Sequence, residues 1–198
     1  MLNDVLTLGD DAKIMNLSFL KTSQDPDIAY KKQSIVDILC EDQNGSSHII
    51  EMQVARQVGF EKRAQYYAAK AYSSQMNAGD DYSDLKQVIF LAFTNHIMFP
   101  NKIAFKSDHA ILNKQTHVHD LRDFSFTFVE LPKFKKTIDE LTSNVDRWIY
   151  FFKHGHEIRE EDLERIIGPL PSIRRAYDEL NQSNWSEAEH LTYDQEVK

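Results

Sequence analysis

Two carboxylates that could share a metal ion lie in residues 32–53, a stretch that has the pattern of two short strands. Asp37 falls on the first strand, and Glu51 and Gln53 fall on the second. Carboxylates that face each other across a strand pair repel when both are ionised, unless a proton or a cation lies between them. A hard cation such as Mg²⁺ prefers one or two carboxylates plus water and substrate phosphate. The pattern therefore indicates either a metal site or the solvated polar face of an ordinary hairpin.

The register of this hairpin decides whether the carboxylates meet. Apolar residues fall at even positions on both strands, so we expect them to share one face against the core. A two-residue loop would put the even residues of the two strands on opposite faces. A three-residue loop, residues 43–45, keeps them together and puts Gly45 at a left-handed position. In that register Asp37 is the partner of Glu51, and Gln53 follows on the same face.

Neighbouring segments are expected to position the hairpin. Residues 13–20 alternate as a strand does. Residues 86–94 form an apolar run typical of a strand that is buried on both faces, and we expect it beside the hairpin. Residues 57–77 carry apolar side chains at helical spacing, with alanines that allow close packing on a sheet.

The helix predicted at residues 57–77 also carries candidate contacts to nucleic acid. Arg63 or Lys70 could project along the helix edge nearest the carboxylates. Arg63 and Tyr67 could clamp or stack on a nucleic-acid backbone. The alternative is a plain amphipathic core helix, which accounts for most of the apolar side chains.

Composition and charge narrow the class of protein. The 198 residues are 41% hydrophobic and 27% charged, which is typical of a globular protein with a sizeable core. No apolar run approaches the ~20 residues of a membrane span, and no signal-peptide pattern opens the chain, so we expect a cytoplasmic protein without a membrane partner. A single cysteine excludes an internal disulfide framework. The net charge of −8 gives no support of its own for DNA binding.

The C-terminal part is expected to be helical and acidic. Residues 134–154 have an apolar stripe at helical spacing, and residues 157–180 form a further helical stretch that is interrupted near Gly168. Acidic side chains gather in the last fifth of the chain. We therefore expect a main domain at residues 1–155 and an acidic helical extension at residues 156–198.

The hairpin sequence resembles the PD-(D/E)XK nuclease signature, an Asp on one strand and Glu-x-Lys or Glu-x-Gln on the next. More narrowly, it is similar to the pattern "K-x-S-I-x-D-I … G … I-E-M-Q" of the Rpn-type recombination-promoting nuclease and transposase family. In the hairpin the resemblance rests on Lys32, Ser34, Ile35, Asp37, Gly45, Glu51, Met52 and Gln53. In the segment that follows it rests on Phe60, Arg63, Tyr66, Tyr67, Tyr72, Gln75, Gly79 and Tyr82. A weaker match continues through Val129, Glu130, Leu131 and Trp148 to Phe152.

This resemblance implies an α/β fold with a PD-(D/E)XK, restriction-endonuclease-like core, in which a mixed β-sheet is flanked by helices and followed by a helical C-terminal extension. It implies that residues 1–155 form the nuclease-like domain. The implied activity is metal-dependent hydrolysis of DNA by an endonuclease that is associated with mobile elements or DNA recombination. The implied partner is DNA, and a homo-oligomer is compatible with this function.

The resemblance also implies roles for individual residues. Asp37 and Glu51 would hold Mg²⁺, or Mn²⁺ or Ca²⁺ in its place, with the main-chain carbonyl of Met52 as a third ligand. Gln53 occupies the place of the lysine in Glu-x-Lys nucleases, and it can orient water but carries no positive charge.

The missing positive charge would then come from another basic side chain. Lys32 in the hairpin and Lys70 on the following helix are the candidates, and the sequence does not place either within reach of the carboxylates.

Two further interpretations stay open. The resembled family carries an upstream helical segment with a D-x-x-F-K motif that is absent here, and its members continue beyond Tyr193, so we expect a chain that is trimmed at both ends. An inactive nuclease-fold remnant that binds DNA or protein is the alternative function. A plain interaction domain with a solvated acidic hairpin is the third.

Overall fold

The structure is a computed structural model, and it describes residues 1–9, 12–21, 23–24 and 34–182. The chain forms two compact units. One unit, called here the sheet unit, comprises residues 14–98 and 106–130. The other, called the helical unit, comprises residues 1–13, 99–105 and 131–198. The boundary near residue 155 that the sequence suggested stays a prediction.

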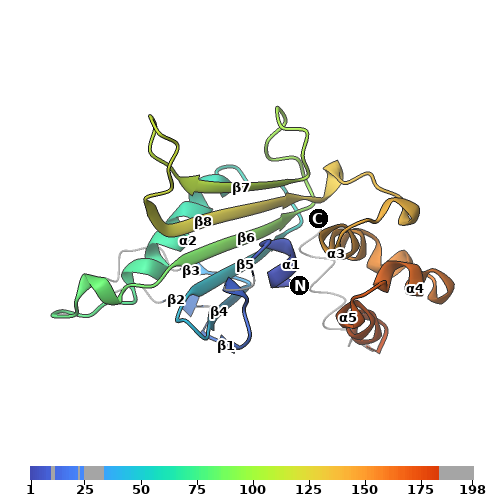
Figure 1. The fold of residues 1–198 in the computed structure, drawn as a ribbon, viewed down its shortest axis with the longest axis horizontal. Coiled ribbons are helices and arrows are strands. Elements are labelled where there is room, and N and C mark those ends of the chain that lie inside the picture. Colours follow the sequence, from blue (N-terminus) through green and yellow to red (C-terminus); the bar gives the residue numbers. More distant parts are fainter. Residues whose placement is uncertain (10–11, 22, 25–33, 183–198) are drawn as a thin grey trace. The chain divides into compact units, whose positions relative to one another are not determined.

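The sheet unit contains a six-stranded mixed sheet with the strand order β1-β4-β5-β6-β8-β7 (Figure 1). β5 pairs with β6 and β6 pairs with β8 in parallel, and the other pairs are antiparallel. A mixed sheet in a chain that also contains α-helices confirms the predicted α/β fold class. The strands of this sheet are β1 (Leu17–Phe19), β4 (Ile38–Asp42), β5 (Ser47–Gln53), β6 (Val88–Thr94), β7 (Lys106–Ile111) and β8 (Leu121–Glu130). A separate antiparallel pair is made by β2 (Ser23–Gln24) and β3 (Ser34–Ile35).

The hairpin formed by β4 and β5 has the predicted register. Ile38 is the partner of Ile50, and the N–H of Asp42 donates to the carbonyl of Ser46 at 3.0 Å, so the loop is residues 43–45. Gly45 has a φ of 82°, the left-handed conformation that this type of loop requires. The three-residue loop is therefore confirmed.

The prediction that the even-numbered apolar residues share one face against the core holds for Val36, Cys40 and Ile50, which are buried, but not along the whole hairpin. Met52 is 46% exposed and Ile38 is 38% exposed, whereas Ile49 is fully buried on the opposite face. The reason is that β5 lies inside the sheet between β4 and β6, and the face of β5 that carries Ile49 is covered by a helix. The interpretation of this face as a solvated polar surface is also wrong, because Glu51 lies on it and is 4% exposed.

The covering helix is α2 (Phe60–Ser73), which lies against the sheet in Figure 1. Phe60 packs against Phe90 of β6 and Phe128 of β8, with 6.3 Å between the ring centroids in both pairs. Ala64 and Ala68 are fully buried, so the backbone of the helix approaches the sheet closely, as the alanine spacing predicted.

α2 ends at Ser73, four residues before the predicted end. After the helix, the Gln75 side chain binds the main chain of Lys86 twice. Its Nε2 donates to the Lys86 carbonyl at 3.0 Å, and its Oε1 accepts from the Lys86 N–H at 2.8 Å. This double hydrogen bond ties the end of α2 to the residues that lead into β6.

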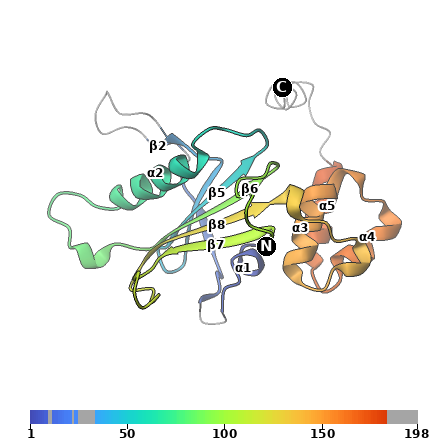
Figure 2. The ribbon, with the colours of Figure 1, turned by 90° about the horizontal axis from the view of Figure 1, so that it is seen from above.

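The helical unit is built from α1 (Leu2–Val5), α3 (Asn144–His154), α4 (Glu160–Ile167) and α5 (Pro171–Gln182). Figure 2 shows α3, α4 and α5 side by side. Short 3₁₀ turns are η2 (Tyr82–Asp84) in the sheet unit and η3 (Leu131–Lys133), η4 (Ile138–Glu140) and η5 (Gly155–Glu157) in this one. The predicted interruption near Gly168 separates α4 from α5. No helix in the described residues is long and apolar enough to cross a membrane.

α3 begins ten residues later than the sequence predicted, because a capping box fixes its start. The hydroxyl of Ser143 accepts from the N–H of Asp146 at 3.1 Å, and the Asp146 carboxylate accepts from the N–H of Ser143 at 3.0 Å. Asp4 of α1 then accepts from the Trp148 indole N–H at 3.1 Å and joins the two helices.

The left-handed loop residue gives a first testable prediction. Gly45→Ala should lower the free energy of unfolding by about 1 kcal/mol, because an L side chain at this φ is strained. Gly45→Asn should cost less, since asparagine tolerates this conformation. Chemical denaturation measures the difference. Gly9→Ala is the control, because Gly9 has no positive φ and an added Cβ would meet nothing within 4 Å. Equal effects at both positions would contradict the role of Gly45.

Candidate active site

Asp37 lies at a bend immediately before β4, with its side chain beside the edge of β5. Its Oδ2 accepts a hydrogen bond from the N–H of Met52 at 2.7 Å. The carboxylate therefore takes the position that a strand partner would fill next to Met52. Since the N–H and carbonyl of one strand residue point the same way, the Met52 carbonyl faces this edge too. The carbonyl of Gln53 points the other way and accepts from the Asn95 N–H at 2.9 Å.

Glu51 lies one position before Met52 and points to the face under α2. The pKa of Glu51 is raised to about 7, chiefly because burial disfavours its charged form, and second because of the negative charge of Asp37. The Arg63 guanidinium offsets part of this rise. Burial therefore raises the pKa of Glu51 more than repulsion by Asp37 does.

The Glu51 carboxylate also has an unused acceptor. Its Oε1 is buried, and in the described part of the chain no hydrogen-bond donor reaches it. A buried carboxylate oxygen without a partner is unfavourable by about 1–3 kcal/mol or more, because it has lost its water. This atom is where a cation or a proton would relieve the site.

Arg63 of α2 joins the site residues of β5. Its guanidinium donates to Gln53 Oε1 at 2.5 Å and lies 3.4 Å from Glu51 Oε2. It also donates to Gln57 and lies over the rings of Phe60 and Tyr67. The prediction that Arg63 or Lys70 lies near the carboxylates is confirmed by Arg63.

Tyr67 forms the buried floor beside Arg63. It is 9% exposed, as the helical spacing predicted. Burial raises the pKa of Tyr67, the charges of Glu51 and Asp37 raise it further, and Arg63 lowers it. The phenol therefore stays protonated next to the carboxylates.

Of the two lysines that could supply the missing positive charge, the structure describes Lys70 and not Lys32. Lys70 is half-buried and follows Arg63 by seven residues on α2, about two helical turns further along. Lys32 lies outside the described residues, so its predicted role in the site stays a prediction.

The structure adds a further buried carboxylate, Glu130, to which the sequence analysis gave no role. Gln53 of β5, Thr94 of β6 and Glu130 of β8 are partners at the carboxyl ends of three parallel strands. Glu130 is fully buried, and its Oε1 accepts from the N–H of Met98 at 2.6 Å. The ends of parallel strands are the usual location of ligands in such sheets. In the sequence, the signal that could have identified Glu130 is the weak match to the family pattern at Val129, Glu130 and Leu131.

Glu130 does not join the hairpin carboxylates in one cluster. Two strand spacings separate Gln53 from Glu130, about 10 Å. Among the described residues, no group of three or more His, Cys, Asp or Glu side chains could hold a metal ion. Asp37 and Glu51, with the Met52 carbonyl, are therefore the oxygen ligands that the site itself offers.

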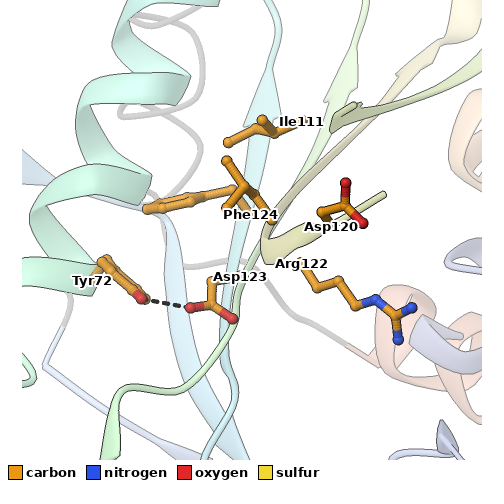
Figure 3. A pocket seen from close by; sticks show the side chains of 7 residues that line it. Tyr72, Ile111, Asp120, Arg122, Asp123 and Phe124 are labelled. Carbon is orange, nitrogen blue, oxygen red and sulfur yellow. Dashed lines mark hydrogen bonds between the residues drawn. The ribbon is translucent and has the colours of Figure 1, made fainter. Parts of the chain in front are cut away.

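A separate cavity of about 340 Å³ lies at the other end of α2, between Tyr72 and the start of β8 (Figure 3). The Tyr72 hydroxyl donates to Asp123 Oδ2 at 2.5 Å, and this bond raises the pKa of Tyr72. None of the hairpin site residues lines this cavity. Its other lining residues are Ile111, Asp120, Leu121, Arg122 and Phe124.

The comparison with known families gives a match that spans the chain. A family model described as PD-(D/E)XK nuclease family transposase matches residues 1–198. No curated protein and no solved structure matches the chain.

The raised pKa of Glu51 predicts how stability depends on pH. Between about pH 4.5 and pH 7 the folded state binds more protons at Glu51 than the unfolded state does, so the free energy of unfolding falls as pH rises through this window. Glu51→Gln should raise the metal-free unfolding free energy at pH 8 by about 1–3 kcal/mol and flatten this slope. Urea denaturation at several pH values measures it.

The matched control is Glu41→Gln, which removes the same charge from an exposed position on β4. It should leave the slope in place. A Glu51→Gln variant that is destabilised at pH 8 would show that the charged carboxylate is needed for the fold, chiefly through Arg63.

Proposed function

We propose that this chain, which belongs to the PD-(D/E)XK nuclease family transposases, is a metal-dependent endonuclease that hydrolyses DNA phosphodiester bonds. The family supports a nuclease or transposase-like role. The observation that carries the finer proposal is that the carboxylate of Asp37 binds the N–H of Met52, the residue next to buried Glu51, and that its charge acts on Glu51. We further propose that the enzyme acts in the cytoplasm and is associated with mobile elements or DNA recombination.

The donor set of the site fits a hard divalent cation. Asp37 and Glu51 offer carboxylate oxygens, and the Met52 carbonyl faces the same edge. Glu51 Oε1 is buried, and no donor from residues 1–9, 12–21, 23–24 or 34–182 reaches it. Oxygen ligands of this kind suit Mg²⁺ best, with Mn²⁺ or Ca²⁺ as alternatives. Such an ion lowers the pKa of bound water and neutralises charge that develops on a phosphate.

The remaining chemistry falls to residues of this chain. Gln53 holds its amide beside Glu51 and can orient a water molecule, with its Nε2 bound to the Ala55 carbonyl at 2.9 Å. Arg63 supplies the positive charge that Gln53 lacks, and its planar guanidinium suits a phosphate group. Arg63 therefore takes the role in this proposal for which Lys32 and Lys70 were the candidates.

One observation favours the second candidate, a nuclease-fold module that binds DNA without cutting it. Arg63 already contacts both Glu51 and Gln53, so the two groups needed for hydrolysis are engaged with a cation of the chain itself. A site held in this closed form would still present Arg63 to a DNA phosphate.

A plasmid-nicking assay separates the two functions. The intact protein should convert supercoiled plasmid to nicked or linear DNA with Mg²⁺ or Mn²⁺ and leave it intact in EDTA. Asp37→Ala and Glu51→Ala should lower the rate by about 100-fold or more, because each removes a metal ligand. Glu41→Ala, at an exposed carboxylate of β4, is the control and should retain the rate. DNA binding without nicking by any of these ions would support the binding module instead.

Thermal denaturation tests metal binding apart from cleavage. A saturating divalent cation should raise the melting temperature of the intact protein by about 2–4 °C through mass action. In Asp37→Asn this rise should vanish, because a ligand charge is lost. The metal-free melting temperature should stay or increase, since asparagine can still accept from the Met52 N–H and the repulsion with Glu51 is removed. A full metal response in Asp37→Asn would locate the cation elsewhere in the chain.

A further inference from the structure

A second candidate site lies in the helical unit, and none of its lining residues belongs to the proposed nuclease site. It is a cavity of about 570 Å³ between the turn at residues 135–139, α3 and α4. Two aspartates, Asp139 and Asp162, are its acidic lining residues. Its five basic Lys and Arg residues are Lys135, Lys136, Lys153, Arg159 and Arg165. A cavity with this excess of positive charge is unexpected in a chain whose net charge is −8.

Three of the basic side chains are neutralised within the unit. Arg165 forms ion pairs with Asp139 and Asp162, and Arg159 lies 2.8 Å from the same Asp162 carboxylate. Lys136 lies 2.7 Å from Asp146, the buried carboxylate that caps α3. These three cations are therefore held by the fold.

The other two, Lys135 and Lys153, differ from them. Lys153 Nζ donates to the main-chain carbonyl of Phe134 at 2.6 Å, which is a neutral acceptor. Burial lowers the pKa of Lys153, and the positive charge of Lys135 lowers it further. Two ammonium groups thus line one cavity close enough to affect each other, and in the described part of the chain neither is paired with a carboxylate.

We propose that this cavity binds a phosphate group, with Lys135 and Lys153 as its charged ligands. A phosphate oxygen accepts charge-assisted hydrogen bonds from both ammonium groups and removes their repulsion. Tyr150 also lines the cavity, and its phenol stays protonated because burial, with the nearby charges of Asp162 and Glu157, raises its pKa. Tyr150 can therefore donate a third hydrogen bond to the anion.

The phosphate can come from two sources. One is a phosphodiester of the DNA backbone, and this source rests on the proposed endonuclease function. The other is free phosphate or a small phosphate ester, and this source is independent of it. The site itself needs neither Asp37 nor Glu51.

Binding measurements in EDTA test the site without any cleavage. Inorganic phosphate is titrated into the full chain by calorimetry, and a labelled DNA duplex is followed by fluorescence anisotropy at physiological salt. The variant is the double substitution Lys135→Gln with Lys153→Gln, which removes both charges and keeps the side-chain length. Phosphate affinity should fall by about tenfold or more, because a hydrogen bond to a charged group is lost at each position.

The control double variant is Lys102→Gln with Arg175→Gln, which removes two exposed charges from the same unit outside the cavity. It should bind phosphate as the intact protein does. A parallel loss of DNA affinity in the cavity variant would identify the backbone as the source, and a loss confined to inorganic phosphate would identify a small ligand.

Three results would overturn the proposal. These are an intact protein that binds neither ligand, a cavity variant with unchanged affinity, and a control variant with the same loss. Because the measurements contain no divalent cation, a failure of the nicking assay leaves this test unaffected.

Discussion

The burial of one carboxylate, Glu51, is the constraint on which the proposed site depends. The side chain lies on an inner strand and is covered by α2, so its charged form is unfavourable unless something offsets the lost hydration. Arg63 offsets part of this, at 3.4 Å from one carboxylate oxygen, while no donor among the described residues reaches the other oxygen. The fold thus holds a carboxylate in a state that a proton or a cation improves.

Two local devices hold this arrangement in place. The left-handed Gly45 closes a loop whose length sets the register of β4 on β5, and the register brings Asp37 to the edge next to Met52. At the other end of α2, Gln75 binds the main chain before β6 and fixes where the helix meets the sheet. Since a one-residue slip of the hairpin would reverse every side chain of β4, the loop matters to the site as much as the ligands do.

The hairpin register and the neighbouring inner strand could be predicted from the sequence, because each depends on a pattern within a short stretch of residues. The even-number pattern around Gly45 was enough for the register, and the apolar run at residues 86–94 was enough for an inner strand beside the hairpin. The covered face of β5 could not be predicted in this way. It depends on how α2 packs across β6 and β8, which the alternation within the hairpin does not encode.

The partners of the site residues required tertiary information for the same reason. Helical spacing placed Arg63 on α2, but its bonds to Gln53 and Glu51 depend on the angle at which α2 crosses the sheet. Glu130 became part of the carboxyl-end face only because β6 and β8 pair in parallel across a long insertion that contains β7. A local sequence motif does not show which strands, far apart in the sequence, pair with each other.

The acidic net charge of the chain does not oppose either proposed site, because electrostatic repulsion in salt is local. At physiological ionic strength exposed charges are largely screened beyond about 8 Å, so a phosphate responds to the groups around it rather than to the total. Arg63 contacts Glu51, Gln53 and Gln57, and the charge of Lys135 acts on Lys153. The distribution of charge over the two units therefore says more about phosphate binding than the sum of −8 does.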